Sequence, residues 1–156
     1  MMHKQALKKI ALCKKKRLKY LDLSHLGLTE IPSEIATLIW LERLSLSYNN
    51  ISDITPLASL TKLHKLSISH NKVIDLSPLT SNEKMKFLFI QENQISDITP
   101  LRHLTTLKKV VAHANNIQTI ESLTSLRHLV YLDVKQNPIQ DLKNLDTLGT
   151  LLVRKV

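Results

Sequence analysis

Cysteine and glycine are both scarce in this chain of 156 residues. The single cysteine, Cys13, has no second cysteine to pair with, so the fold cannot depend on an internal disulfide. The two glycines, Gly27 and Gly149, are too few for a glycine-rich phosphate-binding loop. The sequence contains neither a CxxC pair nor an HExxH motif, the two patterns that would indicate a zinc site. We therefore expect no cofactor, no bound metal and no small-molecule substrate.

Long apolar runs are missing as well. No stretch approaches the roughly 20 apolar residues that a transmembrane helix needs, so we expect no membrane span. A secretory signal is not expected either, because the apolar segment around Ile10 is short and basic residues follow it at positions 14–17. With 43% hydrophobic residues, the chain has the composition of an ordered protein rather than a disordered one.

Acidic residues are absent from the first 19 positions, where eight of the 22 basic residues lie. The rest of the chain, with 14 basic and 13 acidic residues, is nearly neutral.

Residues 1–17 are predicted to form an amphipathic capping helix, with a membrane-surface or nucleic-acid-binding helix as the alternative. Cys13 is expected to be a buried residue of the cap; the alternative is a thiol whose pKa the neighbouring lysines lower. The predicted apolar side consists of Ala6, Leu7, Ile10 and Ala11, with Leu12 or Cys13.

The remaining chain repeats itself every 22 residues. When the repeats are aligned, the columns of equivalent residues that begin at Leu41, Leu44 and Leu46 are apolar in five successive repeats. Further apolar columns begin at Ile51 and Ile54, and others follow them. One polar column has no exception: Asn49, Asn71, Asn93, Asn115, Asn137. A fixed period of this kind predicts a solenoid of stacked repeats.

The repeated pattern LxxLxLxxNxIxxIxxLxxL resembles the leucine-rich repeat, in the short subclass found in internalins and in a nuclear phosphatase regulator. The resemblance covers residues 18–156. It implies an α/β solenoid, namely a right-handed leucine-rich repeat superhelix with a parallel, concave β-sheet and an N-terminal helical cap. We expect six repeats over residues 18–150, the first with 23 residues, and a terminal edge strand over residues 151–156, where Arg154 occupies a core position.

The second half of each repeat is predicted to be 3₁₀ turns and extended chain on the convex side. Pro56, Pro78 and Pro100 share one column, and proline suits a tight turn but lacks the donor that a strand needs. The asparagine column is expected to satisfy backbone groups where the chain leaves the strand. Asn82 is a departure, because it occupies a column that is otherwise leucine.

Alternation along each strand assigns an inward and an outward set of side chains. In the first repeat Leu21 points inward and Tyr20 outward. Phe87 and Phe89, the only phenylalanines, are both predicted to face solvent; the alternative is that one of them folds under a neighbour or fills a gap near Ala112. The predicted protein-binding residues are Tyr20, Arg43, Lys65, Phe87, Phe89, Lys109, Val111, His113, Tyr131 and Lys135.

These features favour a non-catalytic module that binds a protein partner on its concave β-face. Nucleic-acid or ribonucleoprotein association through the basic N-terminal segment is the alternative. An enzyme is disfavoured, since most of the histidines fall in different columns and a Ser–His–Asp set near His70 would be coincidental. An intracellular location, cytoplasmic or nuclear, is favoured over that of a secreted effector, and the sequence does not identify the partner.

Overall fold

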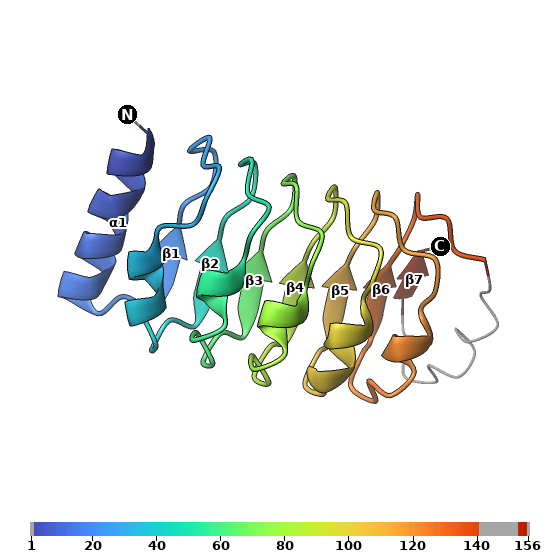
Figure 1. Cartoon of the computed structure of the whole chain (residues 1–156). Helices are drawn as coiled ribbons and strands as arrows, with labels where there is room; N and C mark the ends of the chain where they lie inside the picture. The colour runs from blue at the N-terminus through green and yellow to red at the C-terminus, as the bar shows by residue number, and fades with distance from the viewer. Residues whose placement is uncertain (1, 141–152, 156) are drawn as a thin grey trace.

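The computed structural model describes residues 2–140 and 153–155, whose helix and strands form one continuous row (Figure 1). Helix α1 (Met2–Lys16) lies at one end of the row, and a seven-stranded sheet extends from it. All pairings are parallel, and the spatial order follows the chain. The strands are β1 (Tyr20–Asp22), β2 (Arg43–Ser45), β3 (Lys65–Ser67), β4 (Phe87–Phe89), β5 (Lys109–Val111), β6 (Tyr131–Asp133) and β7 (Val153–Lys155).

The strand register reproduces the sequence period. Tyr20 lies opposite Arg43, 23 residues further along the chain, and each later pairing joins residues 22 apart. The last pairing sets Arg154 opposite Leu132. Parallel neighbours require the chain to return behind the sheet after every strand, and such crossovers are right-handed. The predicted right-handed solenoid with a parallel sheet is confirmed.

The hydrophobic core lies between the sheet and the returning segments. The leucine columns point into this space, and Leu44, Leu66 and Leu88 at the centres of their strands are fully or almost fully buried. Because each repeat stacks on the next, one continuous apolar core runs along the solenoid. The last members of four columns, Leu142, Leu145, Leu148 and Leu151, lie outside the described residues.

The returning segments contain short 3₁₀ turns, as the proline column predicts. Three of the turns have proline near their start. Asp53 and Asp97 each accept the backbone N–H two residues on, at 2.8 Å, and hydrogen bonds of Thr55 and Thr99 lower the pKa values of these carboxyls. The 3₁₀ turns span Ser33–Thr37, Thr55–Leu57, Ser77–Leu79, Thr99–His103 and Glu121–Leu123.

The asparagine column joins each repeat to the one before it. Asn71 Nδ2 donates to the carbonyl oxygens of Ile68 in its own repeat and Leu46 in the preceding one, both at 3.0 Å. Its Oδ1 accepts the backbone N–H of Ile51, also at 3.0 Å. Asn93, Asn115 and Asn137 repeat this arrangement. The predicted asparagine ladder is therefore present.

Helix α1 covers the first repeat, and its buried side is narrower than predicted. Ala6, Ile10 and Cys13 are buried, while Ala11 and Leu12 are exposed. The prediction was wrong for Ala11, because only residues spaced three or four apart share the side of the helix that faces β1. Of the two residues left open, Cys13 is the buried one and Leu12 is exposed. Lys9 Nζ reaches from this side to the Asp22 carbonyl at 2.9 Å. No helix among the described residues is long and apolar enough to cross a membrane.

We expect the Cys13 thiol to react slowly with disulfide reagents in the folded protein. Burial raises its pKa, so the neighbouring lysines do not activate it, contrary to one of the two sequence-based readings. Reaction requires opening of the cap. Ile10→Ala, which removes a buried side chain next to it, should cost about 2–4 kcal/mol and accelerate the reaction more than about tenfold.

The matched control is Leu12→Ala, because Leu12 is 48% exposed on the same helix. Stopped-flow measurement of thiol modification at several reagent concentrations provides the rates. If Cys13 reacted as fast in the folded protein as in urea, the proposed role of burial would be wrong.

Asn82 breaks the leucine column and is completely buried. Its Nδ2 donates to the Leu60 carbonyl at 2.8 Å, but its Oδ1 has no hydrogen-bond partner within the described residues. The Leu60 carbonyl also accepts the Leu63 backbone N–H at 3.0 Å, so it does not depend on the side chain of Asn82. An unsatisfied buried acceptor of this kind lowers stability.

Asn82→Leu should therefore raise the free energy of unfolding by about 1–2 kcal/mol, because the two side chains have similar shapes and no backbone group loses its only partner. Urea unfolding followed by circular dichroism gives the measurement. The reverse change at the equivalent position, Leu104→Asn, should destabilise the protein. A loss of stability in Asn82→Leu would show that the asparagine has a partner of its own, such as a buried water.

Candidate protein-binding face

The outward side chains of β1–β6 form one continuous surface, here called the sheet face. Parallel pairing in register places equivalent residues of successive repeats next to one another. The first row is Tyr20, Arg43, Lys65, Phe87, Lys109, Tyr131, and the second is Asp22, Ser45, Ser67, Phe89, Val111, Asp133. The third row follows just beyond the strands: Ser24, Ser47, Ser69, Gln91, His113, Lys135.

The two phenylalanines both lie on the sheet face and neither belongs to the hydrophobic core. Phe87 is 36% exposed, and Phe89 is half-buried. Neither ring fills a gap in the core, so that alternative is wrong, but Phe89 is partly covered, with Lys65 and Lys109 approaching its ring. Val111 differs, because only 8% of it is exposed where it pairs between Phe89 and Asp133. It offers a partner little surface.

The first row contains three aromatic rings and three cations, and the two kinds of side chain contact each other. The Arg43 guanidinium carbon lies 5.2 Å from the centre of the Tyr20 ring. Lys109 Nζ lies 4.1 Å from the centre of the Tyr131 ring. Each contact of this type contributes about 0.5–1 kcal/mol at an exposed site. The rings thus hold the ends of long, otherwise flexible side chains in position.

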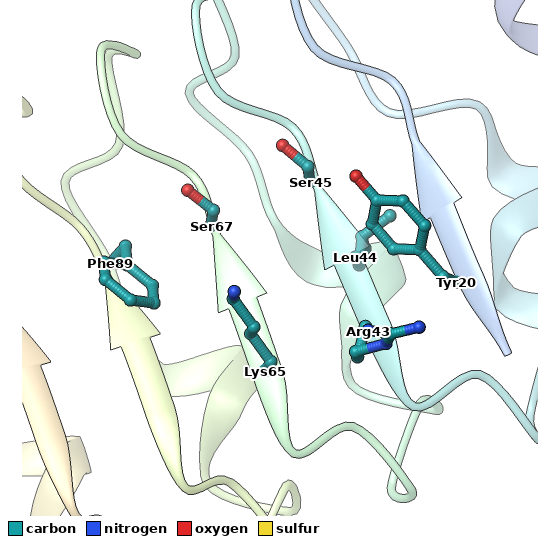
Figure 2. A pocket seen from close by; sticks show the side chains of 7 residues that line it. All are labelled: Tyr20, Arg43, Leu44, Ser45, Lys65, Ser67 and Phe89. Atoms are coloured by element: carbon teal, nitrogen blue, oxygen red, sulfur yellow. The ribbon is translucent and has the colours of Figure 1, made fainter.

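A hollow of about 510 Å³ occupies the sheet face over β1–β4 (Figure 2). Tyr20 and Phe89 stand at its two ends, and Leu44 lies beneath it. Ser45 and Ser67 were absent from the predicted site, although they belong to the same outward column as Phe89. Between the rings, cations line one side and hydroxyls the other: Arg43, Lys65, Ser45, Ser67.

Acidic side chains on and beside the sheet face already have partners. Burial of Asp22 opposes its ionisation, but hydrogen bonds from the Ser24 hydroxyl at 2.6 Å and backbone N–H at 2.9 Å outweigh this and lower its pKa. Glu92 lies 2.8 Å from His70, and Asp133 lies 3.6 Å from His113. His113 therefore faces a carboxylate of its own chain.

The cations of the first row differ from these carboxylates in their partners. Within the described part of the chain, Arg43, Lys65 and Lys109 form no ion pair with a carboxylate. Lys65 Nζ and Lys109 Nζ instead approach the Phe89 ring from the neighbouring strands, at 5.5 and 5.6 Å from its centre. The sheet face therefore carries positive charge that the protein does not neutralise within this row.

A stack of three rings borders the sheet face; the sequence places the three residues in one column, and the structure adds that their rings stack. His25, Tyr48 and His70 lie with ring centres 4.3 and 4.0 Å apart and interplanar angles of 11° and 14°. Their backbones have φ values of 52–58°, so the left-handed turn at the same position of each repeat projects these side chains in parallel. The Tyr48 ring fills the space between the two imidazoles.

The serines near this stack bond to one another rather than to a base. Ser47 Oγ lies 2.6 Å from Ser67 Oγ and accepts the Ser69 hydroxyl at 2.9 Å. No serine–histidine hydrogen bond occurs in residues 2–140. The Ser–His–Asp set considered from the sequence is therefore not assembled. The described residues also contain no group of three side chains suited to hold a metal ion.

Comparison with known proteins gives the same architecture. The structure of internalin C2 from Listeria monocytogenes has 35% sequence identity and a TM-score of 0.78, covering 80% of this chain and 55% of that one. Another Listeria monocytogenes internalin (inlF) has 34% identity and a TM-score of 0.87, covering 93% of this chain and 42% of that one. The chain thus spans about half the length of these structures or less. No curated protein sequence matches it.

Sequence models of the repeat itself match most of the chain. A model of two leucine-rich repeats matches residues 16–59, 39–81 and 61–103, and a model of one such repeat matches residues 125–142. These matches coincide with the asparagine ladder, the parallel strands and the 3₁₀ turns described above. The chain belongs to the leucine-rich repeat family.

Proposed function

We propose that this chain is a non-catalytic interaction module that holds a segment of a protein partner on its sheet face. Leucine-rich repeat and internalin-like proteins generally mediate protein–protein interaction and typically lack enzymatic activity. The observation that carries the proposal for this face is the placement of Phe87 and Phe89 on the outward side of β4. Large apolar side chains held outside a core, with a polar surround, are typical of a binding hot spot.

The energies favour the aromatic pair as the centre of binding. Truncation of an aromatic residue at a binding hot spot costs at least about 2 kcal/mol, whereas a solvent-exposed ion pair contributes about 0–1 kcal/mol. Tyr20 and Tyr131 extend the aromatic surface along the first row, and Lys135 lies exposed at the end of the third row. The cations contribute orientation and association rate more than affinity.

Site-specific crosslinking tests the location of the binding face. Ser45 lies on the sheet face, and Ser81 is exposed on the returning segment after the third 3₁₀ turn. Each is changed to cysteine in a Cys13→Ala background and labelled with a benzophenone. Protein adducts that form from position 45 and not from position 81 would support the proposal. Equal adducts from both positions, or adducts from position 81 alone, would contradict it.

Nucleic-acid association through α1 is the second candidate, and it has a specific observation behind it. Lys4, Lys8, Lys14, Lys15 and Lys16 are exposed on a helix that contains no acidic residue. Removal of the helix would uncover the core, so Lys14, Lys15 and Lys16 should instead be changed together to glutamine. Binding of a single-stranded oligonucleotide that weakens steeply with salt and disappears in this variant would support the second candidate. Binding that the variant leaves unchanged would exclude it.

A further inference from the structure

We infer that the partner segment held on the sheet face is acidic and extended, with carboxylates that bind between Arg43 and Lys65. This inference rests on the proposed function and specifies the chemistry of the partner. It follows from a difference between the acidic and the basic side chains of the sheet face in the partners they have within the protein. The carboxylates of Asp22 and Asp133 accept hydrogen bonds within the protein and Glu92 lies 2.8 Å from His70, whereas the cations of the first row have no carboxylate partner in the described residues.

The neighbouring loops reinforce this asymmetry. A second hollow of about 420 Å³ lies where the chain enters the strands, and three lysines and a histidine contribute to its lining. Its one acidic residue, Glu42, is paired with Lys19 at 2.7 Å and with His64 at 3.4 Å. Positive charge therefore continues from the first row of the sheet face onto this edge. The lysines are Lys62, Lys84 and Lys86.

The hollow between Tyr20 and Phe89 has the groups that a carboxylate requires. The Arg43 guanidinium presents a planar fork of donors, which suits a carboxylate better than any other side chain does. Lys65 adds an ammonium, and the hydroxyls of Ser45 and Ser67 line the opposite side. A segment crossing the strands would place an acidic side chain here and an apolar one against Phe87.

The same contacts disfavour single-stranded nucleic acid on this face. Bases bind to aromatic side chains by stacking on an open ring face. Lys65 and Lys109 approach the Phe89 ring from both neighbouring strands, and Arg43 and Lys109 lie over the rings of Tyr20 and Tyr131. These cations obstruct stacking, while their charges still attract carboxylates. An acidic protein segment fits the arrangement better than an oligonucleotide does.

Selection from a random 12-residue peptide library displayed on phage tests the inference without a known partner. We expect the wild-type chain to select peptides rich in aspartate and glutamate next to an aromatic or aliphatic residue. The best peptide is then synthesised with a fluorescent label, and its affinity is measured by anisotropy. Replacement of its acidic residues by their amides should weaken binding at least about tenfold.

The protein variants locate the effect. Arg43→Gln/Lys65→Gln should weaken binding of the selected peptide at least about tenfold. Lys14→Gln/Lys15→Gln removes the same charge from α1 and should change affinity by less than about twofold if contacts at the hollow dominate. Binding of a 12-nucleotide oligothymidine should be weaker than that of the peptide at the same salt concentration.

The outcomes separate this inference from the proposed function. Neutral or basic peptides whose binding depends on Phe87 and Phe89 would overturn the acidic partner and leave the proposed face intact. Peptide binding that is indifferent to both phenylalanines, or no selection at all, would overturn both. Oligothymidine that binds more tightly than any peptide and is lost in Arg43→Gln/Lys65→Gln would overturn the inference in favour of nucleic acid.

Discussion

Phe87→Ala combined with Phe89→Ala is expected to weaken binding of a protein partner at least about a hundredfold. Truncation of an aromatic residue at a binding hot spot costs at least about 2 kcal/mol, and about 1.4 kcal/mol corresponds to a tenfold change in affinity. Phe87 should account for much of the loss, because it is 36% exposed before binding. Phe89 adds a second effect, since its ring also positions Lys65 and Lys109.

The measurement is the dissociation constant of a captured partner or selected peptide for the two forms. Ile39 and Ile74, which are 57% and 56% exposed but lie outside the sheet face, provide the matched control when both are changed to alanine. The Phe variant should keep its circular dichroism spectrum, since neither ring belongs to the core. Unchanged affinity in a folded Phe87→Ala/Phe89→Ala protein would remove the basis for the proposed binding face.

Asn71→Ala should lower the free energy of unfolding by about 3 kcal/mol, and Tm by roughly 6–12 °C. The carbonyls of Leu46 and Ile68 would each keep one amide donor, from Asn49 at 2.7 Å and from Asn93 at 3.0 Å. The backbone N–H of Ile51 would lose its acceptor and stay buried. An orphaned buried donor costs about 1–3 kcal/mol, to which the other lost hydrogen bonds add.

Thermal unfolding followed by circular dichroism measures this effect. Asn50→Ala is the control, because Asn50 is exposed and its side chain makes no hydrogen bond within the described residues. A Tm for Asn71→Ala within about 2 °C of the wild type would mean that the ladder contributes little. In that case the apolar stacking alone would hold adjacent repeats together.

Two buried asparagines thus have opposite expected effects on stability. Asn71 satisfies four backbone groups at one turn of the solenoid. Asn82 donates to carbonyls that already have other donors and leaves its own oxygen unpaired. The sequence identified both positions, one as a regular column and the other as a departure. Only the hydrogen-bond partners show which asparagine stabilises the fold.

Two predictions differed from the structure for local reasons. Val111 occupies the outward column, but only 8% of it is exposed where it pairs between Phe89 and Asp133. Ala11 belongs to an apolar run, yet the helix turns it toward solvent. The favoured prediction for Cys13 is confirmed, because the thiol is buried and burial raises its pKa more than the hydrogen bond to the Leu18 carbonyl lowers it.

The sequence alone determined the strand register, the direction of each strand side chain and the ladder of asparagines. These follow from a period of 22 residues, because every repeat imposes the same hydrogen bonds and the same inward face on the next one. Only the tertiary structure decided which charges on the sheet face are neutralised. The pairing of a charge depends on the direction in which its long side chain extends across the neighbouring strands. Lys65 and Lys109 turn toward the Phe89 ring, and no pattern in the sequence predicts that direction.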